Sequence, residues 1–86
     1  MNEEIMLIAQ EECAEVIQAI SKIMRFGLDV SYKGVVNRDH LEEEIGDLLC
    51  MFELMEEKNI IDWADVANAA KAKRAKLKIW SGIENV

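Results

Sequence analysis

The sequence predicts an all-α fold, and three observations carry this prediction. The 86 residues contain no proline and only four glycines, whereas residues that favour helices, such as Ala, Glu, Lys, Leu and Met, are abundant. Runs that alternate apolar and polar residues, the pattern typical of strands, are missing. Apolar residues recur instead at helical spacing over three segments. A chain of 86 residues is near the lower limit of what one core stabilises alone, so self-association is also predicted.

The first predicted helix runs from a cap near Asn2 to Arg25 or Phe26. An asparagine side chain accepts hydrogen bonds from the free amides of the first helical turn, and Gly27 supplies the left-handed position that commonly ends a helix. The segment 28–38 that follows has no sustained period. It is predicted to be either an ordered connection or a mobile lid over a site, and the sequence leaves both alternatives open.

The second predicted helix begins near Asp39 and continues to about Lys58, because Asp39 and Glu42 have the spacing of a capping box. Asp62 is predicted to cap the third helix, which covers Trp63 to about Trp80. This third helix is rich in alanine, and its second half is basic. Lysine and arginine suit the C-terminal end of a helix through its dipole.

The charge distribution and the apolar pattern exclude several classes of function. Residues 1–70 hold 16 acidic and 5 basic residues, whereas residues 71–86 hold 5 basic residues and 1 acidic residue, and the net charge is −7. This balance argues against nucleic-acid binding, and the apolar runs are too short to span a membrane. The N-terminus lacks the basic region of a signal peptide, so a cytoplasmic location is expected. Cys13 and Cys50 are predicted to be reduced core residues.

Four carboxylates fall on the apolar faces of the first two helices. At about 100° per residue, Glu12 projects into the middle of the apolar sector of the first helix and Glu15 to its edge. Glu44 and Asp47 project among the leucines and methionines of the second helix. Because a buried carboxylate needs a compensating positive charge, the two i, i+3 pairs predict a divalent-cation site. Ligands that are all oxygen favour Mg²⁺, with Mn²⁺ as a substitute.

Other metal sites do not fit this pattern. The single histidine, His40, does not follow a glutamate by three residues, which argues against a di-iron carboxylate bundle. An EF-hand loop is also missing from the sequence. The alternative interpretation of the four acids is that the helical phases are displaced by one residue and the side chains face solvent.

Two motifs in these helices resemble those of the MazG-like all-α nucleoside triphosphate pyrophosphohydrolases. The run Glu11-Glu12-Cys13-Ala14-Glu15 is similar to the E-E-x-x-E motif of that family, and Glu44-Ile45-Gly46-Asp47 is similar to its E-x-x-D motif. The resemblance covers about residues 5–58 and implies one MazG-like helical domain over residues 1–86. It further implies that Glu12, Glu15, Glu44 and Asp47 bind Mg²⁺, the same four residues that the helical projection selects. The implied reaction converts a nucleoside triphosphate to the monophosphate and pyrophosphate.

The resemblance also implies roles for residues outside the metal site. The run Asn68-Ala69-Ala70-Lys71 looks like a late N-x-x-K element that contacts the phosphates of the substrate, and Arg74 follows one turn later. Asn68, Lys71 and Arg74 are therefore the implied substrate-binding residues. Glu11 or Glu12 is implied to orient the attacking water, and the sequence does not choose between them.

One departure from the family bears on assembly. Many members carry a helix before the first acidic motif, whereas ten residues precede Glu11 here. The prediction is a three-helix protomer that completes a four-helix-type bundle by homo-oligomerisation, as a homodimer or a homotetramer. Two other functions stay open: a phosphoribosyl-ATP pyrophosphohydrolase, and a non-enzymatic helical dimerisation module.

Overall fold

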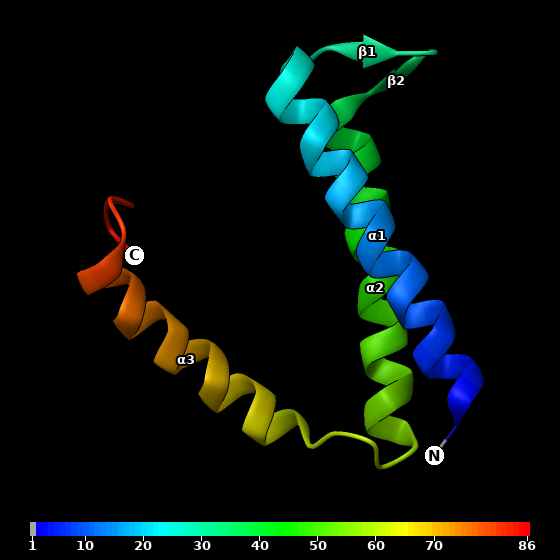
Figure 1. Ribbon diagram of the computed structural model, residues 1–86, viewed down its shortest axis with the longest axis vertical. Coiled ribbons are helices and arrows are strands. Elements are labelled where there is room, and N and C mark those ends of the chain that lie inside the picture. Colours follow the sequence, from blue (N-terminus) through cyan, green and yellow to red (C-terminus); the bar gives the residue numbers. More distant parts are fainter. Residues whose placement is uncertain (1) are drawn as a thin grey trace.

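Two long antiparallel helices form the body of the protein in this computed structural model, which describes residues 2–86. They are α1 (Glu3–Phe26) and α2 (Asn37–Glu57), and a third helix, α3 (Trp63–Trp80), leads away from them (Figure 1). A hairpin of two short strands, β1 (Ser31–Tyr32) and β2 (Val35–Val36), joins α1 to α2. The described chain is therefore mainly helical, which confirms the predicted class.

The ends of α1 and the start of α3 follow from local side-chain chemistry. The Asn2 side chain accepts a hydrogen bond from the backbone N–H of Ile5 at 3.3 Å, and Gly27 ends α1 with a φ of 114°. Asp62 caps α3 in the same way, since its carboxylate accepts from the backbone N–H of Ala64 at 2.8 Å. These caps confirm the predicted end of α1 and the predicted starts of α1 and α3. A cap forms between residues that are close in sequence, so a local pattern can predict it.

The predicted start of α2 is wrong by two residues. The helix begins at Asn37, and no side chain caps it, so the expected capping box at Asp39 does not define its start. Asn37 is buried, and its side-chain N–H donates to the carbonyl of Gly27 at 3.0 Å, while its backbone N–H donates to the carbonyl of Val30 at 2.9 Å. Contacts with the end of α1 therefore set the start of α2, and a local sequence pattern does not reveal them.

The segment between α1 and α2 forms a regular β-hairpin. Lys33 and Gly34 both have positive φ, 50° and 82°, as a two-residue type I′ turn requires. The short strands on either side pair antiparallel. Beside them, the Arg38 guanidinium donates to both carboxylate oxygens of Asp29, at 3.0 and 3.3 Å. The hairpin is thus fixed at its base by side chains as well as by the strand ladder.

The hydrophobic core lies at one end of the α1–α2 pair. Its buried members are Ile5, Ala9, Met51 and Met55, and partly buried apolar residues of both helices and of the 60–61 segment pack against them. Toward the other end, Ala19 is 1% exposed, because its small side chain allows α2 to approach closely. No large side chain of residues 2–86 is fully buried. The single chain therefore has a small core for its length.

The chain is extended for its size. Its radius of gyration is 15.5 Å, compared with about 12 Å for a compact chain of this length. Helix α3 contributes no buried residue, and Trp63 and Trp80 are 43% and 82% exposed. An arrangement of this kind leaves much of the apolar surface of the single chain in water.

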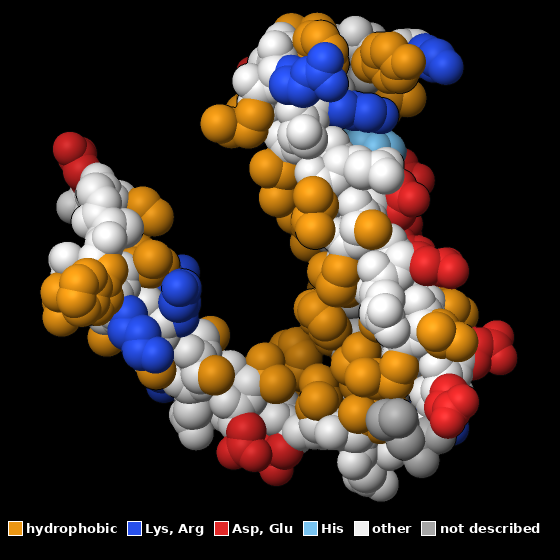
Figure 2. Space-filling view, viewed as in Figure 1, with side chains coloured by type: hydrophobic (Ala, Val, Ile, Leu, Met, Phe, Trp, Pro, Cys, Tyr) orange, Lys and Arg blue, Asp and Glu red, His pale blue; other side chains and the backbone are white. Residues whose placement is uncertain are grey.

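An apolar face of the α1–α2 pair is exposed on the side toward α3 (Figure 2). We call this surface the open face. By helical spacing, Ile17, Ile20 and Met24 share one side of α1, and Ile45 and Leu49 share one side of α2; all five are 45% exposed or more, and we assign them to the open face. The exposed patch is continuous along both helices, and such patches mark interaction surfaces. The fold therefore has a surface on which a further helix could pack.

The two cysteines differ from the prediction. Cys13 and Cys50 are free thiols, and both are exposed in the single chain. Their prediction as core residues is wrong here, because only two helices pack against each other and the sides that carry the cysteines have no neighbour. No helix among residues 2–86 is long and apolar enough to cross a bilayer.

Substitution of Gly27 by alanine should lower the free energy of unfolding by about 1–3 kcal/mol. The φ of Gly27 is 114°, and a β-carbon there would lie 3.1 Å from a methyl group of Val30. Gly46 is the matched control, since a β-carbon at this helical position would meet nothing within 4 Å. Gly46→Ala should raise the free energy of unfolding by about 0.5–1 kcal/mol. Urea denaturation followed by circular dichroism measures both, and equal effects at the two positions would contradict the assigned role of Gly27.

Candidate functional site

Three carboxylates meet where α1 faces α2. Glu12 of α1 and Glu44 and Asp47 of α2 each place an oxygen within 4.8 Å of the other two. We call this group the acidic cluster. Glu44 and Asp47 are three residues apart on one helix, so their side chains point to one spot beside it. The antiparallel packing of α1 brings Glu12 to the same spot.

The acidic cluster borders the hydrophobic core. Glu12 follows the buried Ala9 by three residues on α1, and Asp47 precedes the buried Met51 by four residues on α2. Glu12 and Glu44 are half-buried, whereas Asp47 is exposed. One side of the cluster is therefore packed against apolar groups, and the other side is open to solvent and to ligands.

Electrostatic strain is concentrated at Glu12. Partial burial raises the pKa of its carboxyl above 4.5, and the negative charges of Asp47, Glu44, Glu15 and Glu11, in decreasing order, raise it further. A carboxylate among other carboxylates at the edge of a core is stabilised when a cation binds between them. The cluster therefore has the charge and the local dielectric of a cation site.

The donor set of the acidic cluster fits a hard divalent cation. Three carboxylates supply only oxygen ligands, as Mg²⁺ and Mn²⁺ prefer, and no nitrogen or sulfur ligand of the kind that selects zinc or copper belongs to the group. The solvent-exposed side leaves room for waters and for phosphate oxygens, which usually complete the coordination of Mg²⁺. The residues present thus suit a metal that is shared with a phosphate ligand.

The structure brings three of the four predicted metal ligands together. Glu15 lies almost one turn further along α1, is half-buried, and falls outside the group of three. Its charge still acts on the cluster, because it contributes to the raised pKa of Glu12. Glu11, one of the two residues predicted to orient water, is exposed beside Glu12.

The predicted phosphate-binding residues lie apart from the acidic cluster in the single chain. Asn68, Lys71 and Arg74 are all exposed on α3. Figure 2 shows basic side chains gathered over the C-terminal half of this helix, across a gap from the α1–α2 pair. Within one copy of the chain, α3 therefore presents its cations to solvent and not to the cluster.

Two residues on the same side of the helices as the cluster, His40 and Lys22, are not among the site residues predicted from the sequence. The Nε2 atom of His40 lies 3.8 Å from Oε1 of Glu44, one turn earlier on α2. His40 and Lys22 both line a small cavity of about 180 Å³ beside the hairpin. Sequence spacing could have indicated both residues. His40 precedes Glu44 by four residues, and Lys22 follows Glu15 by seven. Each therefore lies on the face of its helix that carries the acidic residues.

Comparison with known families adds an independent finding. A family model described as the MazG nucleotide pyrophosphohydrolase domain matches residues 1–78. The match includes both acidic motifs and most of α3. No curated protein and no solved structure matches the chain.

Substitution of Glu12 by glutamine should stabilise the metal-free protein at neutral pH. Because the pKa of Glu12 is higher in the folded state than the ordinary 4.5, the folded state binds more protons between these two values. The free energy of unfolding of the native chain must then fall as the pH rises through that window, from 4.5 upward. The glutamine variant lacks this contribution.

Thermal unfolding in the presence of a chelator, measured over a series of pH values, checks this prediction. The melting temperatures of native protein and Glu12→Gln should diverge as the pH rises, with the variant more stable at the upper end. Parallel curves would mean that Glu12 does not experience the electrostatic strain assigned to it.

Proposed function

The chain belongs to the MazG nucleotide pyrophosphohydrolase family, and from this premise we propose that it hydrolyses a nucleoside triphosphate to the monophosphate and pyrophosphate with the help of Mg²⁺ or Mn²⁺. Family membership supports a nucleotide pyrophosphohydrolase-type activity in general. The observation that carries the finer proposal is the acidic cluster, since its members all come from the two acidic motifs.

Each carboxylate has a role in this proposal. Glu12, Glu44 and Asp47 hold the cation, and Glu15 adds negative charge and a further ligand when its side chain turns toward the cluster. A divalent cation, when bound, neutralises charge on phosphate oxygens and lowers the pKa of a water molecule. The half-buried positions of Glu12 and Glu44 hold the ligands in place and limit competing waters.

The proposed reaction is an in-line displacement at the α-phosphorus. The oxygen of a water molecule bonds to phosphorus while the bond to the oxygen that bridges the α and β phosphates breaks, so that pyrophosphate leaves. Glu11 or Glu12 orients this water and accepts its proton. Glu12 lies in the cluster itself, whereas Glu11 is exposed on the adjoining side of α1, so both positions are compatible with this role.

We further propose that a second copy of the chain covers the open face and completes a four-helix-type bundle. Three properties support a second copy as the occupant: the continuous apolar surface of α1 and α2, the lack of any buried residue in α3, and the opposite charges of the two parts of the chain. Residues 1–70 carry 11 more negative than positive charges, whereas residues 71–86 carry 4 more positive charges. A basic helix of one copy is therefore attracted to the acidic body of another.

Activity measurements test the metal-site proposal. Glu12→Gln, Glu15→Gln, Glu44→Gln and Asp47→Asn should each lower turnover by at least about 100-fold, because metal-ion catalysis contributes several kcal/mol to the transition state. Release of pyrophosphate from a panel of ribo- and deoxyribonucleoside triphosphates and phosphoribosyl-ATP is the assay, with Mg²⁺ and then with chelator.

The exposed neighbour Glu43 provides the matched control, since Glu43→Gln removes the same charge from the same helix outside the cluster. Full activity in any two of the four variants would remove the metal site from the mechanism. A thermal melt with and without Mg²⁺ separates the enzyme from a non-enzymatic dimerisation module, because a cation that binds only the folded state must raise the melting temperature.

Substitution on the open face tests the assembly. Ile17 is 68% exposed on this face, and Ile17→Glu should convert the oligomer to monomers at micromolar concentration, because a charge would be buried between the copies. Leu7 is 60% exposed on another side of α1, and Leu7→Glu should leave the assembly unchanged. Sedimentation equilibrium measures both masses. A monomeric native protein, or an oligomeric Ile17→Glu, would contradict the proposed interface.

A further inference from the structure

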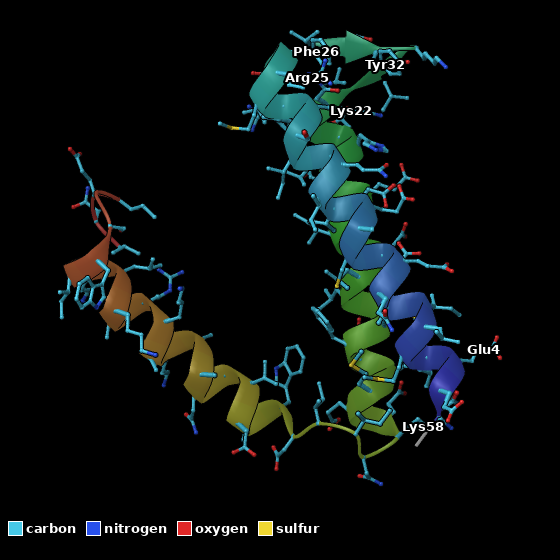
Figure 3. The ribbon with its side chains drawn as sticks, in the orientation of Figure 1. Glu4, Lys22, Arg25, Phe26, Tyr32 and Lys58 are labelled. Atoms are coloured by element: carbon cyan, nitrogen blue, oxygen red, sulfur yellow. The ribbon has the colours of Figure 1, made fainter. Side chains whose placement is uncertain are left out.

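A cavity of the described chain lies beside the hairpin and not at the acidic cluster. It has a volume of about 450 Å³, and its lining includes Lys22, Arg25 and Phe26 from α1 and Tyr32 from β1. Figure 3 shows these four side chains together at the hairpin end of α1. We call it the hairpin cavity. Its size is within the range of pockets that hold small organic ligands.

The hairpin cavity continues toward the acidic cluster. A second cavity of about 180 Å³ shares Lys22, Tyr32 and Asn37 with it and adds His40 to the lining. His40 in turn lies 3.8 Å from Glu44 of the cluster. The two cavities therefore adjoin each other, and the smaller one ends at His40, next to the acidic cluster. We call this series of neighbouring sites the track.

The length of this track suits an extended nucleotide. Ten residues separate Glu12 from Lys22 on α1, which corresponds to about 15 Å along the helix axis. A nucleoside triphosphate has comparable length from its terminal phosphate to the far edge of its base. A ligand whose phosphates lie at the acidic cluster can therefore reach the hairpin with its other end.

The lining of the hairpin cavity matches a flat group with a polar edge. Phe26 and Tyr32 are 55% and 51% exposed, so both aromatic residues are accessible from solvent. The hydroxyl of Ser31 and the buried amide of Asn37 supply polar groups at the same cavity. Aromatic rings that stack on a base, together with a few fixed polar groups, are the usual means of holding a nucleobase.

Positive charge is concentrated at the same end of the molecule. Four of the five basic residues within residues 1–70 lie between positions 22 and 38. The ammonium of Lys22 lies 5.1 Å from the centre of the Tyr32 ring, and the guanidinium of Arg25 lies 5.0 Å from that of Phe26. The ammonium of Lys33 also lies over the Tyr32 ring, at 5.4 Å. A base that stacks on these rings therefore displaces the flexible cations from the ring faces, and the displaced cations remain available to a phosphate at the mouth of the cavity.

From these observations we propose that the hairpin cavity receives the base and sugar of the nucleoside triphosphate, with Lys22 beside the phosphate nearest the sugar. The proposal rests on the proposed function, since it assumes that the phosphates lie at the acidic cluster. Tyr32 and Phe26 hold the base, and Lys22, which lines both cavities, lies between base and phosphates. The hairpin thereby determines which nucleotides the protein accepts.

Nuclear magnetic resonance distinguishes the two ends of the ligand. The probes are inorganic tripolyphosphate and the hydrolysis-resistant α,β-imido analogues of ATP and CTP, each added with Mg²⁺ to the ¹⁵N-labelled full chain. All probes should shift the amide signals near Glu12, Glu44 and Asp47. At least one nucleotide analogue should shift the signals of residues 26–37 as well, whereas tripolyphosphate should not.

Two pairs of variants sharpen this test. Tyr32→Ala should weaken binding of the nucleotide analogue about 10-fold, because a stacking contact is lost, and Tyr32→Phe should bind like the native chain. Lys22→Met should weaken binding of the analogue, whereas Lys58→Met, which removes the same charge at the opposite end of the α1–α2 pair (Figure 3), should not. Binding of tripolyphosphate should be unchanged in Tyr32→Ala.

The outcomes separate the two proposals. Shifts at the acidic cluster without shifts at the hairpin, or unchanged binding by Tyr32→Ala, would overturn the base site and leave the proposed function intact. A lack of Mg²⁺-dependent shifts at the cluster with every probe would overturn the proposed function, and the base site with it.

Discussion

The contact between α1 and α2 is the constraint on which the rest of the structure depends. It is secured at both ends by different means. At one end, Ile5 and Met55 belong to the hydrophobic core, and at the other, the buried Asn37 donates to the carbonyl of Gly27. Between these ends the helices hold the acidic cluster, whose charges repel one another. The two secured ends resist this repulsion, so the carboxylates stay close together and ready for a cation.

The single chain buries little of its apolar surface. Two packed helices and a hairpin leave the open face and α3 exposed in the described chain, and the core contains few buried side chains. Chains of this length rarely gain enough stability from so little burial. Assembly of copies would bury the open face and would supply the cations of α3 to an acidic surface. In the proposed assembly, burial of the open face would add stability, and the cations of α3 would add positive charge near the acidic surface.

The parts of the structure that sequence could predict are those that depend on near neighbours. The caps at Asn2 and Asp62 and the end of α1 at Gly27 are local and agree with the prediction. The helical projection selects four carboxylates, Glu12, Glu15, Glu44 and Asp47, because a period of 3.6 residues fixes the side of a helix on which a residue lies. The structure groups three of them and leaves Glu15 outside.

What sequence could not predict depends on contacts between distant segments. Asn37 starts α2 through bonds to the end of α1, so the local capping pattern at Asp39 was misleading. The hairpin was missed because its strands are too short to alternate, although Lys33-Gly34 between β-forming residues was a usable turn signal. The exposure of Cys13 and the direction of α3 depend on which surfaces pack against other segments. A single sequence does not specify these contacts.

The positions of lysine and arginine along the chain favour one direction of the nucleotide in the proposed site, with its base at the hairpin. Residues 1–21 and 39–57 contain no lysine or arginine, so Lys58, directly after the end of α2, is the one lysine or arginine of residues 2–58 on the side of the acidic cluster away from the hairpin. With the base at the hairpin, the β and γ phosphates extend toward that side, and the leaving pyrophosphate develops its charge there. Lys71 and Arg74 are exposed on α3 and do not reach the cluster of their own chain. In the proposed assembly, Lys71 and Arg74 of a second copy would supply the charge that stabilises the leaving group.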